Sequence, residues 1–100
     1  MKEVIIRGGN NVHAVDVEAA IHEHPQVVEA AVVGVPHPVL GEDVAAYVVP
    51  RPGDPLSCED LQAFLRERLA DYKVPRAVTF VDELPRNATG KVVKRLLVEG

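Results

Sequence analysis

The sequence predicts an α+β fold: a small domain with a roughly three-stranded sheet flanked by helices, plus an N-terminal β-hairpin. Its length of 100 residues fits a single domain. Hydrophobic residues make up 47% of the chain, enough to build a core without disulfides or a structural metal. Stretches of nearly continuous apolar residues, typical of covered strands, alternate with stretches of helical periodicity. This alternation indicates the fold class.

The first quarter of the chain predicts a hairpin followed by a helix. Residues 4–6 are Val-Ile-Ile, a strand by composition. Residues 8–11, Gly-Gly-Asn-Asn, form a strong turn signal because both residue types tolerate positive φ. Residues 12–13 can then pair back as the second arm. Apolar residues recur at helical spacing over residues 17–24, and Pro25 should end that helix.

The middle of the chain predicts two covered strands. Residues 26–36 are nearly continuously apolar, and so are residues 44–50. Between them, residues 37–43 contain Pro and Gly and should form a loop. Residues 51–57 are rich in turn formers and should connect the second strand to the next helix.

The second half of the chain predicts a helix, a strand and a final helix. Ser57 stands three residues before Asp60, a capping-box pattern at a helix start. Apolar residues follow at helical spacing over residues 61–72. Residues 76–85 should form a strand, and residues 92–98 a short helix. The predicted order is therefore β-β-α-β-β-α-β-loop-α.

Composition and charge exclude several functional classes. The formal net charge of −4 argues against general nucleic-acid binding, which needs a positive surface. No apolar run approaches the ~20 residues of a membrane helix, so we expect no transmembrane segment. Cys58 is the sole cysteine, which excludes an internal disulfide and favours a cytoplasmic location.

The loop before the final helix carries the most distinctive candidate residues. Lys91 follows Gly90 and is a mobile cation with three hydrogen-bond donors. The loop is not a P-loop, because Arg86 stands where that motif needs Gly, and a valine follows the lysine. Asn87 and Thr89 add uncharged donors. From spacing alone, this loop is either an anion site or a solvated turn.

The other candidate sites are weaker. Residues 8–11 could let backbone approach a ligand closely, or could form an ordinary hairpin turn. His22 and His24 are two apart and point to different faces of a helix, whereas paired helical metal ligands prefer i, i+4 spacing. We therefore predict no metal site. Cys58 is expected in the first turn of a helix and looks structural.

Three segments together resemble a known family over essentially the whole chain. They are "IIRGGNNVHAVDVEAAI", "VVEAAVVGVPHPVLGEDVAAYVV" and "YKVPRAVTFVDELPRNATGKVVKRLL". In this order and spacing they are similar to the Gly-Gly, Gly-x-Pro and closing Leu-Pro-x-x-x-x-Gly-Lys motifs of the adenylate-forming enzymes. The chain resembles the small C-terminal domain of the acyl-CoA synthetases in that superfamily.

The resemblance implies roles for particular residues. Lys91 falls on the family's catalytic lysine, and Lys2 falls on the hinge between the two domains. Gly8 and Gly9 fall in the loop that lines the channel for the pantetheine arm of CoA. The residues expected to support Lys91 are Arg86, Asn87, Thr89 and Gly90.

Two acidic residues match the family pattern: Asp16 and Glu18 fall on the acidic positions of the helix after the glycine loop. At other positions the chain departs from the pattern. Ala14 replaces the usual Pro at the start of that helix, which should cost little pre-organisation. His37 replaces the common Asp, so any role of that Asp is in doubt. Asn10 stands where Glu is common. The glycine loop looks more like that of fatty-acyl or small-acid CoA ligases than that of peptide synthetases.

The resemblance implies that residues 1–100 are a mobile C-terminal lid that begins at the hinge. The reaction would convert a carboxylic acid, ATP and CoA to acyl-CoA, AMP and pyrophosphate, with Mg²⁺ needed by the full-length enzyme. The partner would be the large N-terminal domain that binds ATP and the acid, and that domain is absent here. We expect the isolated chain to be inactive, with Lys91 as a cation that leaves once the adenylate has formed.

Two other interpretations share the same sequence signals. The first is a stand-alone binding or regulatory module of this fold that acts in trans. The second is an anion-binding loop on an unrelated α+β domain, which would bind phosphate without a partner.

Overall fold

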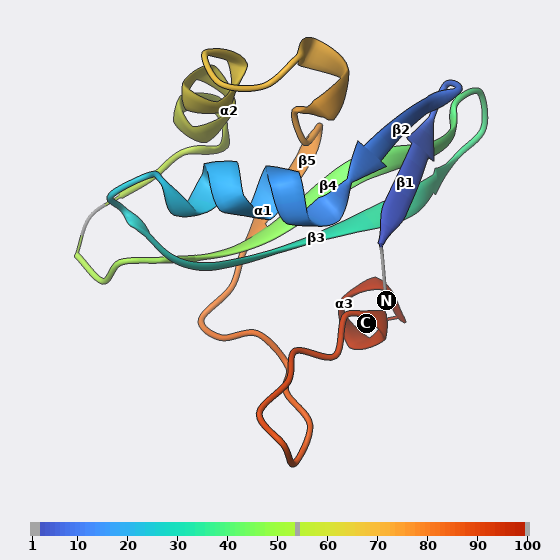
Figure 1. Ribbon diagram of the computed structural model, residues 1–100. Helices are drawn as coiled ribbons and strands as arrows, with labels where there is room; N and C mark the ends of the chain where they lie inside the picture. The colour runs from blue at the N-terminus through green and yellow to red at the C-terminus, as the bar shows by residue number, and fades with distance from the viewer. Residues whose placement is uncertain (1–2, 54, 100) are drawn as a thin grey trace.

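The computed structural model describes residues 3–53 and 55–99, which form a mixed sheet with helices on one face and the C-terminal segment on the other (Figure 1). The predicted N-terminal hairpin is confirmed, with β1 (Val4–Arg7) and β2 (Asn10–His13) joined by Gly8 and Gly9. The predicted turn over residues 8–11 is too long, because Asn10 and Asn11 pair with β1 as part of β2. Gly8 and Gly9 have φ of 57° and 85°. Positive φ at both central residues is typical of the two-residue turn that suits a twisted hairpin.

The sheet has five strands and includes the hairpin. The other strands are β3 (Val27–His37), β4 (Gly41–Pro50) and β5 (Ala77–Phe80). Strand β4 is central: β3 pairs antiparallel along one edge, while β1 and the parallel β5 pair with different parts of the other. The α+β class is confirmed. The hairpin is part of the main sheet through one residue pair, Arg7 with Gly41.

The expected loop over residues 37–43 is wrong, because pairing between β3 and β4 continues to His37 and Gly41. Pro36 does not break the strand, although it lacks an N–H group. Strand β3 pairs with β4 alone among the described strands, so it is an edge strand, where proline is tolerated. The turn is left with residues 38–40.

Helix α1 (Ala14–His22) covers one face of the sheet, and α2 (Cys58–Arg66) packs beside it (Figure 1). The capping prediction is confirmed, since the Asp60 N–H donates to the Ser57 hydroxyl at 3.0 Å. Helix α2 ends six residues earlier than predicted. Leu69 and Tyr72, which extend the apolar pattern beyond the end of α2, still pack against the core. A turn and a short 3-10 helix, η1 (Asp71–Lys73), place them there.

The segment after β5 leaves the sheet and crosses to its opposite face. Strand β5 is therefore shorter than the predicted 76–85, and the last helix, α3 (Arg95–Glu99), begins three residues later than predicted. Neighbouring residues of a strand point to opposite faces. Val32 accordingly joins the main core under the helices, whereas Ala31 joins a second cluster. That cluster also contains Val49, Leu84, Tyr47, Val81, Val92 and Leu97.

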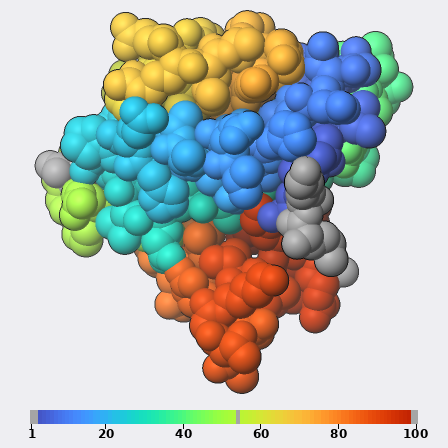
Figure 2. Space-filling model, viewed as in Figure 1, coloured from blue at the N-terminus to red at the C-terminus, as the bar shows by residue number. Residues whose placement is uncertain are grey.

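The second cluster holds the C-terminal segment against the sheet. This segment projects from the rest of the molecule as a separate lobe (Figure 2). Among the residues described, no helix is long and apolar enough to span a membrane.

Candidate active site

The loop that carries Lys91 is a small hairpin. Arg86 and Val92 form an antiparallel bridge, and the Asn87 N–H donates to the Lys91 carbonyl at 2.9 Å. The Gly90 N–H donates to the Asn87 carbonyl at 3.0 Å. Gly90 has a φ of 87°, a conformation that glycine adopts readily and other residues rarely adopt. The glycine before the lysine therefore closes the turn.

The Asn87 side chain holds this turn from inside. Its Oδ1 accepts from the N–H groups of Thr89 and Lys91, both at 3.0 Å, and from the Thr89 hydroxyl at 2.6 Å. Asparagine side chains commonly organise turns in this way. Of the two predicted uncharged donors, Thr89 therefore uses its hydroxyl inside the loop. Asn87 orders the turn through its oxygen, and its Nδ2 has no hydrogen bond among the described residues.

Arg86 braces the same loop. One of its nitrogens, Nη1, donates to the Gly90 carbonyl at 2.9 Å, while Nη2 forms an ion pair with Glu29 of β3. A planar guanidinium can serve two acceptors at once. Arg86 therefore links the tip of the loop to the sheet.

Lys91 is exposed, and among the described residues its ammonium has no hydrogen bond or ion pair. It borders a groove of about 730 Å³ between the C-terminal segment, strand β3 and helix α1. The other residues around this groove are Glu3, Glu18, Ala30, Ala31, Asn87, Val92, Val93, Lys94 and Arg95. The structure thus presents an unpaired cation on an ordered turn.

Lys94, three residues after Lys91, is partly buried, and its ammonium group is paired. Its Nζ donates to Glu18 at 2.7 Å, to Glu3 at 2.9 Å and to the Val32 carbonyl at 3.0 Å. Burial alone would lower the pKa of Lys94, but the bonds to Glu18 and Glu3 outweigh it and raise that pKa above its usual value. Sequence reasoning missed this contact, because nothing in the spacing of Glu18 and Lys94 marks them as neighbours.

Helix α3 is held to the sheet by one more polar contact. The Tyr47 hydroxyl of β4 donates to the Leu97 carbonyl at 3.0 Å. Together with the second apolar cluster, this bond fixes the far end of the segment that contains Lys91.

The glycine turn lies at another end of the molecule from the Lys91 loop (Figure 1). It rests on the β3–β4 turn, where the Gly8 N–H donates to the Leu40 carbonyl at 2.9 Å. His37 organises that second turn, because its Nδ1 accepts from the N–H groups of Val39 at 3.1 Å and Leu40 at 3.0 Å. An aspartate oxygen could accept the same bonds, so the departure at position 37 preserves the turn.

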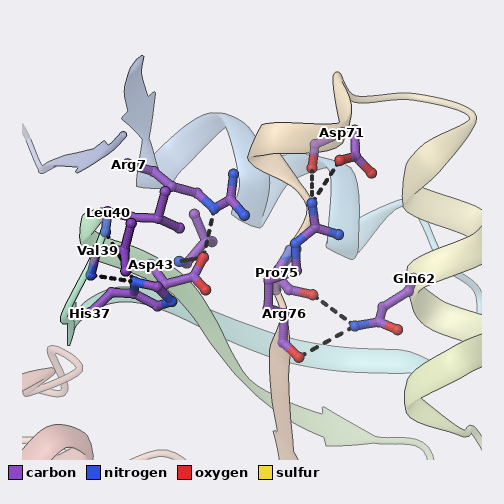
Figure 3. A network of polar contacts seen from close by, with 10 residues as sticks. Arg7, His37, Val39, Leu40, Asp43, Gln62, Asp71, Pro75 and Arg76 are labelled. Atoms are coloured by element: carbon purple, nitrogen blue, oxygen red, sulfur yellow. Dashed lines mark hydrogen bonds and ion pairs between the residues drawn. The ribbon is translucent and has the colours of Figure 1, made fainter. Parts of the chain in front are cut away.

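A polar network holds together the end of the molecule where the glycine turn and the β3–β4 turn lie (Figure 3). Arg7 Nε donates to Asp43 at 2.7 Å, which ties β1 to β4. Burial raises the pKa of Asp43, but the Arg7 guanidinium and the Val44 N–H hold it below its usual range. Nearby, hydrogen bonding to Arg76 lowers the pKa of the exposed Asp71. Gln62 of α2 donates to the carbonyls of Pro75 and Arg76, at 2.9 and 3.5 Å.

The remaining predicted residues carry less information. Lys2, the expected hinge, lies outside the described residues. Asp16 lies exposed in the first turn of α1, while Cys58 is the half-buried first residue of α2. Within residues 3–53 and 55–99, no three or more His, Cys, Asp or Glu side chains gather as metal ligands would.

Comparison with known proteins identifies a matching family. Residues 16–91 match the family described as AMP-binding enzyme C-terminal domain. A long-chain-fatty-acid–CoA ligase of Bacillus subtilis is 47% identical over 98 residues, which are 98% of this chain and 18% of that ligase. The chain thus spans about a fifth of the length of the curated relatives it matches.

Solved structures agree in fold. Apo MatB from Rhodopseudomonas palustris superposes with a TM-score of 0.93 at 44% identity, covering 97% of this chain and 19% of that one. The amide bond synthetase McbA from Marinactinospora thermotolerans gives 0.94 at 42% identity, with coverages of 98% and 20%.

Proposed function

Since the chain belongs to the AMP-binding enzyme C-terminal domain family, we propose that it is the mobile lid of an AMP-forming acyl-CoA synthetase. Membership of this family excludes the interpretation of an unrelated α+β domain with an anion-binding loop. The proposed parent enzyme converts a carboxylic acid, ATP and CoA to acyl-CoA, AMP and pyrophosphate. The observation that carries the proposal is the Lys91 loop, an ordered turn whose single protruding cation has no partner among the described residues.

In the first half-reaction, the acid's carboxylate attacks the α-phosphate of ATP, and pyrophosphate leaves. Two anions approach each other, so the transition state gathers negative charge that a positioned cation stabilises. A unit charge 4 Å from another contributes about 4 kcal/mol at an effective dielectric constant of 20. Lys91 can supply that charge because no carboxylate of residues 3–53 or 55–99 pairs with it. The bonds from Asn87 and Arg86 keep its backbone in one conformation beforehand.

In the second half-reaction, a thiol attacks the acyl-adenylate and AMP leaves. We propose that the domain rotates about Lys2, withdraws Lys91 and presents the Gly8–Gly9 turn to the thiol channel. The separation of the two loops in the fold supports this exchange of faces (Figure 1). A turn of two glycines carries no side chains, so a slender pantetheine arm can pass close to its backbone.

The partners would be the N-terminal domain of the same enzyme and its substrates ATP, a carboxylic acid and CoA. The family implies Mg²⁺ with ATP, but the described residues contain no cluster of three or more metal-binding side chains. We propose that Mg²⁺ would be held by the ATP phosphates and by the N-terminal domain.

The proposal can be tested by grafting this chain in place of the matching segment of the Bacillus subtilis ligase. We expect this chimera to catalyse both pyrophosphate exchange and acyl-CoA formation, whereas the ligase truncated before the segment should catalyse neither. A folded but inactive chimera, or a truncated ligase as active as the chimera, would contradict the proposal. Restored activity when the chain is added to the truncated ligase as a separate polypeptide would instead favour the stand-alone module.

A further inference from the structure

Two lysines in the C-terminal segment have opposite surroundings although only two residues separate them. Lys91 is exposed and unpaired among the described residues. The Lys94 side chain is 20% exposed and has three acceptors within 3.0 Å of Nζ. An ammonium group has three N–H donors, so the capacity of Lys94 is fully used.

The three acceptors come from three separate parts of the fold. Glu18 belongs to α1, the Val32 carbonyl belongs to β3, and Glu3 lies just before β1. The Glu18 Oε2 atom also accepts from the Val32 N–H at 2.8 Å, so the carboxylate is itself fixed by the sheet. Lys94 therefore joins the C-terminal segment to elements that the main core already holds in place.

We propose that Lys94 is a positioning residue for adenylation: its bonds to Glu18, Glu3 and Val32 fix where the Lys91 loop stands relative to the domain. This inference rests on the proposed function, because it assigns Lys94 a role through Lys91. Lys94 itself contacts no substrate in the proposed reaction and acts only through the position of Lys91. Its bonds anchor the chain three residues after Lys91, while Arg86 anchors it five residues before.

The consequence is that domain rotation carries Lys91 as part of a rigid body. With one anchor lost, the loop would keep its internal hydrogen bonds but sample more positions relative to the sheet. A displacement of about 1 Å at a reacting centre can cost roughly 10²-fold in rate. Binding of ATP elsewhere would be unaffected, so the loss should fall on kcat and not on KM.

The test uses pyrophosphate exchange by the chimera with Lys94→Met, and Lys73→Met as the matched control. Lys73 lies in η1, away from the Lys91 loop, and its substitution changes the net charge equally. We expect Lys94→Met to lower kcat by roughly 10²-fold with the KM for ATP unchanged, and Lys73→Met to change neither. Lys94→Arg should restore part of the rate, since a guanidinium can reach the same acceptors. Wild-type exchange by a folded Lys94→Met chimera would overturn the proposal.

A second variant separates positioning from stability. Lys94→Met alone leaves the Glu18 carboxylate unpaired by a cation, which also lowers stability. Adding Glu18→Gln removes that charge and should restore the Tm, yet the anchor remains absent, so kcat should stay low. Recovery of kcat together with Tm would show that Lys94 acts through stability and would overturn the proposal.

A structural measurement keeps this inference apart from the proposed function. In the 100-residue chain, Lys94→Met should lower the ¹⁵N heteronuclear NOE values of residues 86–98 below those of the sheet, whereas Lys73→Met should not. Unchanged values would overturn the positioning role. Lys91→Ala is measured alongside: if it leaves exchange intact, the proposed function fails, while the NOE values still judge the anchor.

Discussion

Replacing Gly90 by alanine tests whether the turn conformation of the Lys91 loop matters for chemistry. Gly90 has a φ of 87°, and a Cβ added there would meet no atom within 4 Å. Alanine would therefore create backbone strain without a clash. An L-residue in a left-handed conformation costs about 1–2 kcal/mol. That cost corresponds to a fall of roughly 5–30-fold in the population of the ordered turn.

Two other glycines have nearly the same φ, and Gly53 serves as the control while Gly9 tests the other loop. Gly53 and Gly9 both have a φ of 85°, and both have open space where a Cβ would lie. Gly53 lies in the connector after β4, far along the chain from either candidate loop. All three substitutions should therefore introduce similar strain at different places.

The assay measures both half-reactions of the chimera. Gly90→Ala should slow pyrophosphate exchange by roughly 5–30-fold and leave thioester formation from preformed acyl-adenylate intact. Gly9→Ala should do the reverse, and Gly53→Ala should change neither rate. Equal loss of exchange in Gly90→Ala and Gly53→Ala would refute the reasoning, because the effect would then come from general strain.

Three further predictions concern the stability of the 100-residue chain, followed by circular dichroism. Ser57→Ala removes the N-cap of α2 and should cost about 1 kcal/mol, which lowers the Tm by roughly 4–8 °C; an unchanged Tm would contradict the capping role. His37→Asp keeps an acceptor for the two turn N–H groups and should leave the Tm unchanged, whereas His37→Leu should lower it; equal effects would refute the capping of this turn. The lowered pKa of Asp43 means that its stabilising ion pair with Arg7 is present above about pH 3.9, the unfolded value, and is lost as the pH falls further. Asp43→Asn should therefore lower the Tm at pH 7 and flatten its fall below about pH 3.9, and an equally steep fall would count against the assignment.

Local patterns predicted most of the elements because each depends on neighbours in sequence. The glycine turn, the Ser57 cap and the covered strands β3 and β4 all follow from such patterns. The predicted loop over residues 37–43 was too long because Pro38 and Gly41 were taken to mark the whole span as a loop. Pro38 does lie in the turn at residues 38–40, but Gly41 begins β4. How far β3 and β4 stay paired depends on contacts between the two strands, which no local pattern marks.

Only part of the candidate site could be predicted from the sequence. Resemblance identified Lys91 and its supporting residues, and the structure describes how Asn87 and Arg86 order the turn. The anchor at Lys94 was missed because its acceptors, Glu18, Glu3 and Val32, come from the first third of the chain. Their proximity arises when the C-terminal segment crosses to the free face of the sheet, and no local period encodes that crossing.

The measurement that tests the central claim most directly is Lys91→Ala in the chimera, assayed for each half-reaction separately. If Lys91 is a removable cation, pyrophosphate exchange should fall by roughly 10²–10³-fold or more. Thioester formation from preformed acyl-adenylate should continue at the wild-type rate, because the lysine has left by then. Equal loss in both half-reactions, or no loss in exchange, would contradict the account.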